Sequence, residues 1–221
     1  ERLSSLGEMT AAISHEIRNP LGIIKSSAEH LRKKVLPDDP SQKIIDIVVE
    51  EAKRLNTIIT DFINFARPRN PNLRPCRVEE VIEKNLNLLT AQANKQGIKI
   101  QTHLNGNISE ITADAEMLHQ AFLNILLNAM QAMPAGGEMI IETMVKDHLL
   151  TIFFDDTGEG ISNEIISKIW DPFFTSKEKG TGLGLGIVKN IIEIHGGQVN
   201  VANKPTQGVR VTIELPLRQE T

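Results

Sequence analysis

Three side chains near the start of the chain could work together in group transfer: His15, Glu16 and Asn19. On a helix, His15 would lie about 200° around the axis from both Ile13 and Ile17, and so away from an apolar face marked by those positions. A neutral imidazole is a nucleophile, and a neighbouring carboxylate or amide can orient it or take its proton. By itself the triplet fits either this chemistry or an ordinary exposed histidine.

Two asparagines, Asn124 and Asn128, stand four residues apart within the otherwise apolar run 122–133. That spacing puts both amides on one face of a helix. Amides on an apolar stripe need hydrogen-bond partners. A hydrated Mg²⁺ with phosphate oxygens would supply them, because Mg²⁺ takes oxygen ligands and few protein groups. A buried pair satisfied by neighbouring protein groups is the other interpretation.

An acidic and glycine-rich segment, 155–161, follows directly after an expected strand. Its glycines, Gly158 and Gly160, would let a ligand approach the backbone closely. The Asp156 carboxylate accepts hydrogen bonds and could hold an exocyclic amine such as that of adenine. Taken alone, such Asp/Gly clusters are more often turns.

A second glycine-rich segment, 180–186, opens an expected helix. Backbone N–H groups at the amino end of a helix bind anions, so phosphates are expected there. The spacing differs from that of dinucleotide-binding and Walker-type loops. Lys177 and Lys179 lie just before it and predict a cationic lid over phosphates. The backbone positions expected to line this anion site are Gly180, Thr181, Gly182, Leu183 and Gly184.

Residues 1–66 predict two long antiparallel helices that would present this histidine. Apolar residues recur every three or four positions on both sides of a break at 36–41. One hairpin leaves part of its apolar stripe uncovered, so we expect a four-helix bundle made by a homodimer. The first apolar seam is Leu3, Leu6, Ile13, Ile17, Leu21, Ile24, Ala28, Leu31 and Val35, and the second is Ile44, Val48, Ala52, Leu55, Ile59, Phe62 and Ala66.

The remainder of the chain predicts a different architecture. Three prolines in 67–77 indicate a linker. Residues 78–221 alternate helical and strand patterns, which favours an α/β sandwich with helices on one face of a sheet. The expected helices are 78–96, 114–133, a short one after Ser162, and 183–195. The expected strands are 98–104, 138–145, 149–154, 198–202 and 208–215.

Composition narrows the function classes. The chain has 221 residues, of which 40% are hydrophobic and 24% charged, with a net charge of −4. These values are ordinary for a globular protein and argue against a general nucleic-acid binder. The only cysteine, Cys76, excludes an internal disulfide and fits a cytoplasmic location. We expect a fragment of a longer protein, with any membrane contact made through a region before residue 1.

Together and in this order, the motifs resemble those of the sensor histidine kinases of two-component systems, and within them the nitrogen-regulator, AtoS and ZraS-like group. The likeness covers nearly the whole chain. The matching segments are a phospho-acceptor box at 14–21, an asparagine box at 124–129, a first glycine box at 156–160, a phenylalanine box at 171–177 and a second glycine box at 180–186.

The resemblance implies a role for each of these residues. His15 would take the γ-phosphoryl group of ATP and pass it to an aspartate of a response regulator receiver domain. Glu16 would act as base or orient the imidazole, and Asn19 would support transfer and regulator dephosphorylation. Asn128 would be the Mg²⁺ ligand with Asn124 beside it. The implied nucleotide-binding set is Asn124, Asn128, Asp156, Gly158, Gly160, Lys177, Gly180, Thr181, Gly182, Leu183 and Gly184, in a domain of the histidine kinase, gyrase and MutL type.

Two departures from the family pattern concern positive charge. Many relatives carry Lys or Arg where this chain has Gln131, and Arg where it has Thr175. We expect Lys177 to supply the missing cation at the phosphates. Two other functions stay open at this point: a conformational ATPase of the gyrase or MutL type, and a non-catalytic dimer scaffold. The first is disfavoured because no Glu stands at 120–123, just before Asn124.

Overall fold

The computed structural model describes residues 2–36, 39–66, 70–105, 110–175, 177 and 180–217, with backbone alone at 2–16, 61 and 64–66. The chain forms two compact units, Glu1–Arg69 and Asn70–Thr221. Each unit is described by itself below. Among the described residues, no helix combines the length and apolar character needed to cross a membrane.

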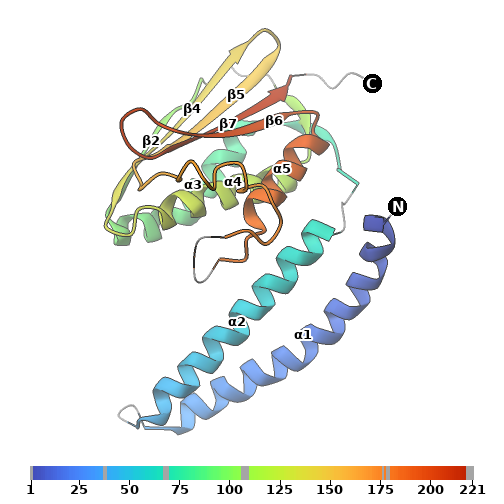
Figure 1. Cartoon of the computed structure of the whole chain (residues 1–221), viewed down its shortest axis with the longest axis vertical. Coiled ribbons are helices and arrows are strands. Elements are labelled where there is room, and N and C mark those ends of the chain that lie inside the picture. The colour runs from blue at the N-terminus through green and yellow to red at the C-terminus, as the bar shows by residue number, and fades with distance from the viewer. Residues whose placement is uncertain are drawn as a thin grey trace. The chain divides into compact units, whose positions relative to one another are not determined.

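The first unit is a helical hairpin of α1 (Arg2–Lys34) and α2 (Ser41–Ala66), as predicted. Figure 1 shows α1 as a curved helix. Pro20 lies inside it and removes one backbone donor, a usual cause of helix bending. Ala28 of α1 and two residues of α2, Val49 and Ala52, are buried. Small side chains at such positions let helices approach closely.

Much of the hairpin's apolar surface stays exposed in the single chain. The exposed large apolar residues of this unit are Ile17, Ile23, Ile24, Leu31, Leu36, Ile44, Ile47, Val48 and Leu55. Several of them belong to the predicted seams. Contiguous apolar surface of this kind marks an interaction site.

The second unit is built on a five-stranded mixed sheet in the order β2-β4-β5-β7-β6. The parallel pair is β2 with β4, and the other neighbours are antiparallel. The strands are β2 (Ile98–His103), β4 (Gly137–Lys146), β5 (Leu149–Asp156), β6 (Gln198–Asn203) and β7 (Val209–Pro216). Their positions match the predicted strands to within two residues.

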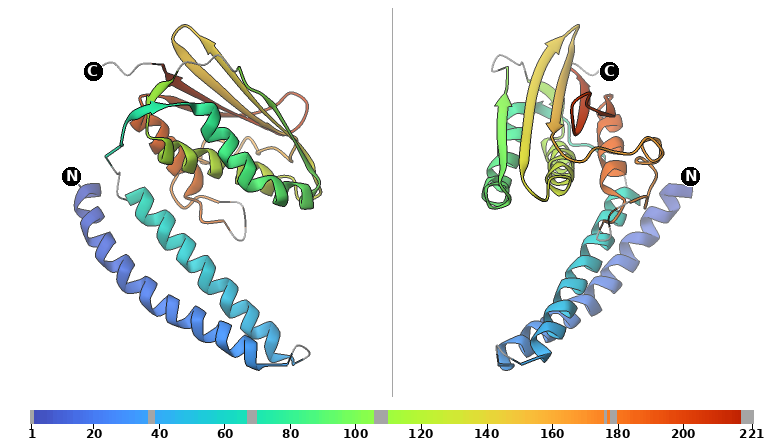
Figure 2. Two further views of the ribbon diagram at one scale, coloured as in Figure 1. Left: turned by 180° about the vertical axis from the view of Figure 1, so that it is seen from behind. Right: turned by 60° about the vertical axis from the view of Figure 1, so that its left-hand side comes forward.

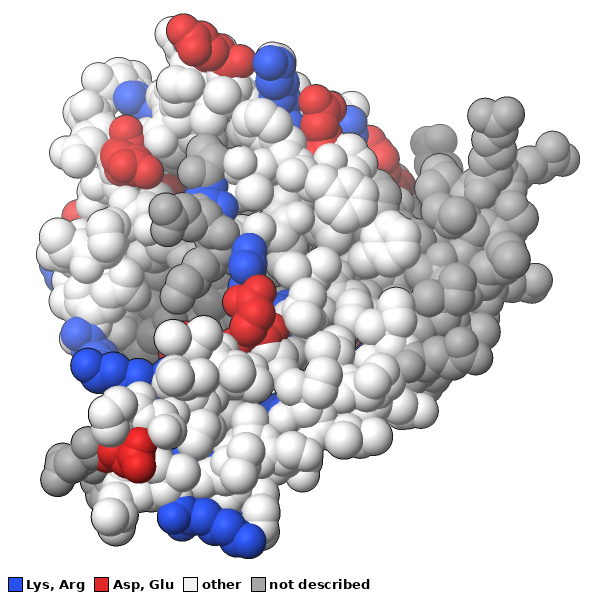
Figure 3. All heavy atoms as spheres, turned by 60° about the horizontal axis from the view of Figure 1, so that its bottom comes forward, with Lys and Arg blue, Asp and Glu red and all other residues white. Residues whose placement is uncertain are grey.

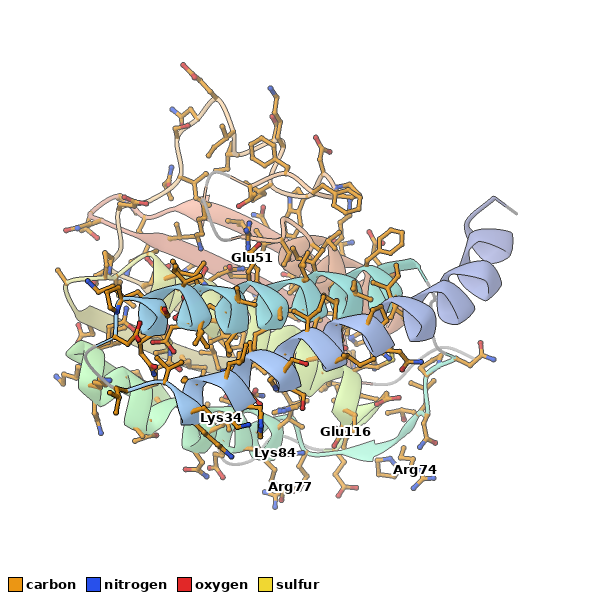
Figure 4. The ribbon with its side chains drawn as sticks, turned by 90° about the horizontal axis from the view of Figure 1, so that it is seen from below. Lys34, Glu51, Arg74, Arg77, Lys84 and Glu116 are labelled. Atoms are coloured by element: carbon orange, nitrogen blue, oxygen red, sulfur yellow. The ribbon has the colours of Figure 1, made fainter. Side chains whose placement is uncertain are left out.

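Three helices cover one face of this sheet: α3 (Val78–Gln96), α4 (Ala115–Gln131) and α5 (Gly184–Ile194). Figures 1 and 2 show all three on the same side. Between the two layers lies the core, where the rings of Phe122 on α4 and Phe154 on β5 are 5.5 Å apart. The predicted sandwich is therefore confirmed. At the surface, Lys84 of α3 pairs with Glu116 of α4 at 3.1 Å (Figure 4).

The amino end of α4 is fixed by a single aspartate. Asp114 accepts hydrogen bonds from the N–H groups of Glu116 and Met117 at 3.0 and 3.1 Å, as an N-cap residue does. Its second oxygen accepts from the N–H of Asn72 at 2.9 Å. The Asp114 N–H donates to Nε2 of the buried His195, at the end of α5. One residue thus joins α4, α5 and the segment entering this unit.

The structure differs from the predictions in three segments, two unpredicted short strands and one expected helix. Strand β1 (Arg74–Cys76) lies inside the predicted linker and pairs antiparallel with β3 (Ile111–Ala113). Part of that segment therefore belongs to the second unit. The short helix expected after Ser162 was wrong, because residues 163–170 form successive turns. There the Ser162 carbonyl accepts from both Ile165 and Ile166.

Candidate functional site

The two asparagines of α4 face the first turn of α5. The amide nitrogen of Asn124 donates to the carbonyl of Gly184 at 3.4 Å. A Cβ added at Gly184 would lie 3.9 Å from both Asn124 Cγ and Asn128 Nδ2. Both asparagines are half-buried. This packing brings the predicted amide pair against the amino end of a helix, where backbone N–H groups favour anions.

The ammonium of Lys177 lies beside the same asparagine pair. Its Nζ donates to Gln131 Oε1 at 2.8 Å and lies 3.5 Å from Asn128 Oδ1. The residue as a whole is exposed, but its charged end lies among protein groups. This desolvation lowers the pKa of Lys177, while the carboxylates of Glu159 and Asp156 act in the opposite direction. The contact with Gln131 is one that the sequence did not predict.

Asp156 lies at the end of β5 and is only 6% exposed. Its Oδ1 accepts from the N–H of Gly158 at 2.8 Å and of Val209 at 3.1 Å. Its Oδ2 accepts no hydrogen bond from any residue that the structure describes. Burial raises the pKa of this carboxyl, although the two N–H donors and Lys204 oppose the shift. A carboxylate oxygen of this kind is suited to accept from a ligand amine.

The neighbouring carboxylate, Asp155, has a different environment. Arg210 donates to it from Nε and from Nη2, both at 2.7 Å, and Lys204 Nζ lies 3.5 Å from its Oδ2. Such a bidentate pair holds the carboxylate in a fixed geometry. Of the two adjacent aspartates, only Asp156 keeps an oxygen available for a ligand.

Gly208 supports Asp156 and was missed by the sequence analysis as a site residue. Its φ is +87°, and a Cβ there would collide with the Asp156 carbonyl. The close approach lets Val209, the next residue, donate to the Asp156 side chain. The available signal was a lone glycine at the start of the last strand, where a bulky residue would otherwise be usual.

The predicted glycine positions shape the loops around this region. A Cβ at Gly158 would lie 2.7 Å from the carbonyl of Ala132, at the end of α4. Gly182 has a φ of +67° and packs on the backbone of Phe173, so a side chain there would clash. Leu183 is fully buried, and its side chain anchors the start of α5 in the core. Of the remaining predicted positions, Gly160 has a positive φ, and a Cβ at Gly180 would collide with the side chain of Thr175. The Thr181 hydroxyl accepts a hydrogen bond from the N–H of Leu183 at 3.4 Å. Gly184 is the first residue of α5.

The predicted phospho-acceptor triplet lies on α1, in the other unit. The side chains of His15 and Glu16 lie outside the described residues, and Asn19 is exposed. The structure therefore gathers the predicted binding residues within the second unit.

Charged side chains do not form a single-sign field on the face drawn in Figure 3. Lys and Arg stand there among Asp and Glu in the part of the chain that is described.

Two family models match the two units. Residues 5–71 match the His Kinase A (phospho-acceptor) domain. Residues 113–219 match the histidine kinase-, DNA gyrase B- and HSP90-like ATPase family. The order of the two domains is the one that the motifs predicted. The chain belongs to the sensor histidine kinases of two-component systems.

Individual proteins agree with this family. The chain is 36% identical over 221 residues to the signal transduction histidine-protein kinase AtoS of Escherichia coli (strain K12), spanning 100% of this chain and 36% of that protein. The full-length kinase ShkA, solved with AMPPNP, superposes with a TM-score of 0.81 at 26% identity, over 97% of this chain and 46% of ShkA. The kinase ThkA, solved with the response regulator TrrA, gives 0.72 at 30% identity, over 98% of this chain and 63% of ThkA.

Proposed function

We propose that this chain transfers the γ-phosphoryl group of ATP to His15 and then to an aspartate of a response regulator. The observation that carries the proposal is the position of Lys177. Its ammonium lies next to Asn128, and Asn128 faces the amino end of α5. A side-chain cation, a helix amino end and half-buried amides together suit a triphosphate.

In this proposal ATP binds along the second unit. Its adenine amine donates to the Asp156 oxygen that no described group occupies, and its phosphates meet the backbone at the start of α5. Glycines at 158, 160, 180, 182 and 184 and the backbone of Thr181 and Leu183 shape the surrounding loops. Lys177 neutralises phosphate charge.

Asn128, with Asn124 beside it, would hold Mg²⁺. An amide oxygen is a suitable ligand for Mg²⁺, which takes oxygen ligands and few protein groups. When bound, Mg²⁺ would neutralise phosphate charge and help to align the triphosphate.

The chemical step would take place at His15. An imidazole nitrogen attacks the γ-phosphorus, the bond to the β–γ bridging oxygen breaks, and ADP leaves. Glu16 accepts or steers the imidazole proton, and Asn19, exposed one turn further along α1, supports transfer to and from the regulator. Phosphoryl transfer depends mainly on positioning and charge neutralisation, which these groups would supply.

Two partners follow from this activity. The regulator would dock on the exposed surface of α1 near His15, and ThkA with its bound regulator supports that class of partner. A second copy of the chain would cover the apolar seams of the hairpin and complete a four-helix bundle. Since ATP and such regulators are cytoplasmic, we propose that this part of the protein works there.

The proposed domain organisation keeps the predicted bounds with one qualification. Residues 1–66 form the dimerisation and phosphotransfer hairpin, 67–77 connect it, and 78–221 bind ATP. Strand β1 ties residues 74–76 to the ATP-binding part, because it pairs with β3.

The fate of the γ-phosphate tests this proposal against its alternatives. Purified chain with Mg²⁺ and ATP should retain phosphoryl groups on protein and release little inorganic phosphate until a regulator is added. Phosphate release that continues unchanged in His15→Gln would instead indicate a conformational ATPase. ATP binding with neither labelling nor release would indicate a scaffold.

A further inference from the structure

Gln131 occupies a position that the proposed chemistry has not used. It ends α4, three residues after Asn128, and it is exposed to solvent. Its side chain nevertheless has a defined partner, because Gln131 Oε1 accepts from Lys177 Nζ at 2.8 Å. The same nitrogen is 3.5 Å from Asn128 Oδ1. Of these two contacts, the shorter one is with Gln131.

The geometry requires such an anchor. The Lys177 side chain has four rotatable bonds, so without a partner its ammonium would sample many positions. Only a few of these positions would allow contact with a phosphate oxygen. An amide oxygen can hold an ammonium without cancelling its charge, as a carboxylate would. The amide is therefore suited to fix the position of a cation that must still attract an anion.

We infer that Gln131 is a positioning residue for the proposed nucleotide site: it holds the ammonium of Lys177 beside Asn128, where that charge meets phosphate oxygens. This inference rests on the proposed function. Two segments would then place this cation: the end of α4 supplies the acceptor, Gln131, and the segment before α5 supplies the donor, Lys177.

Electrostatics agrees with this arrangement. Desolvation lowers the pKa of Lys177, so holding the charged form there has a cost. The nearby carboxylates of Asp156 and Glu159 favour the charge but do not contact it within the described part of the chain. Gln131 provides the direct hydrogen bond, and phosphate oxygens would add a charge partner.

The test is ATP affinity measured by titration calorimetry with EDTA present, so that the chain supplies the only site cation. We expect Lys177→Ala and Gln131→Ala each to weaken binding by roughly threefold to tenfold, in the range of a partly exposed charged hydrogen bond. The double variant should bind no more weakly than Lys177→Ala. In the Lys177→Ala background, Gln131→Lys should restore affinity by returning a cation to α4.

Controls separate this role from a structural one. Gln92→Ala, an exposed glutamine on α3, should leave affinity unchanged, and all variants should unfold at the wild-type temperature. Two results would overturn the inference. One is that Gln131→Ala binds ATP as tightly as wild type. The other is that Gln131→Ala weakens ATP binding as much in the Lys177→Ala background as in wild type. Failure of the wild-type chain to bind ATP with Mg²⁺ would instead overturn the proposed function.

Discussion

At the scale of residues, two adjacent aspartates show how environment separates structure from function. Asp155 and Asp156 are both 6% exposed. Arg210 engages both oxygens of Asp155, whereas two backbone N–H groups engage a single oxygen of Asp156. Because residues alternate faces along a strand, the two carboxylates point in opposite directions. The sequence predicted the role of Asp156 but contained no signal for the partners of either residue.

Replacing each aspartate by asparagine should therefore have different effects. Asp156→Asn removes the carboxylate oxygen offered to the adenine amine and should lower ATP affinity about tenfold or more. Asp155→Asn removes the partner of Arg210 and should lower the unfolding temperature with little change in affinity. Calorimetric titration with ATP measures the affinity of both variants, and thermal unfolding measures their stability. Equal ATP affinities of Asp155→Asn and Asp156→Asn would contradict the assignment of Asp156 to the adenine amine.

The pH dependence of binding adds a second expectation for Asp156. Burial raises its pKa, so it protonates at a higher pH than an ordinary carboxyl. Protonation turns the acceptor oxygen into a donor, which opposes the adenine amine. As the pH falls through this raised pKa, wild-type affinity should approach that of Asp156→Asn. A ratio of the two affinities that stays constant between about pH 7 and pH 4 would contradict this.

At the scale of elements, predictions succeeded where local chemistry is strong. The helix α4 begins after Asp114 and stops before Pro134, so cap and breaker define both ends. The strand β1 was missed because three residues containing Pro75 show no alternation. The turns at 163–170 were predicted as a helix because spacing alone does not distinguish one helical turn from repeated turns. The Lys177–Gln131 contact joins distant segments and has no local pattern.

Gly208 tests how the loop before β7 supports the site. Gly208→Ala combines an unfavourable positive φ with a collision against Asp156 and should cost roughly 3 kcal/mol of unfolding free energy. Gly196→Ala has a similar φ of +69° but its nearest neighbour is 3.7 Å away, so it should cost only about 1 kcal/mol. Chemical denaturation compares them. Equal losses would show that the contact with Asp156 has no energetic role.

Asp114 tests the junction of α4, α5 and the entering segment. Asp114→Ala should lower the unfolding free energy by about 1–2 kcal/mol, the usual cost of a lost N-cap. Burial alone would raise the pKa of Asp114, but N–H donors from Asn72, Met117 and Glu116, with a further contribution from His195, lower it. A lowered carboxyl pKa stabilises the fold above the unfolded-state value.

The stability difference at Asp114 should therefore depend on pH in one direction. The difference in unfolding free energy between wild type and Asp114→Ala should have its full value near pH 7. It should become smaller as the pH falls below about 4, because Asp114 is protonated as the pH passes through its lowered pKa. Denaturant unfolding of wild type and Asp114→Ala at several pH values measures it. A difference that widens in acid would contradict the capping role.

At the scale of the whole molecule, the two units match the two functions that a histidine kinase core must combine. The hairpin offers apolar surface for a second copy, and the sheet-and-helix unit gathers the groups suited to ATP. The chain spans 36% of AtoS and 46% of ShkA.

The homodimer is testable on the exposed apolar face of α1. Ile24 and Leu31, 48% and 52% exposed, stand seven residues apart and so share one helix face. The double change to Glu should convert a dimer to a monomer in sedimentation analysis, because charges would be buried at the bundle interface. Leu36→Glu, beyond the end of α1, should leave the dimer intact. A monomeric wild-type chain would contradict the bundle.

The central claim is that His15 accepts the γ-phosphoryl group of ATP. The most direct measurement incubates wild type, His15→Gln and Ser14→Ala with Mg²⁺ and γ-labelled ATP and then treats each product with acid or base. The account predicts an acid-labile, base-stable label on wild type and Ser14→Ala, and none on His15→Gln. Label that persists on His15→Gln, or that survives acid, would contradict it.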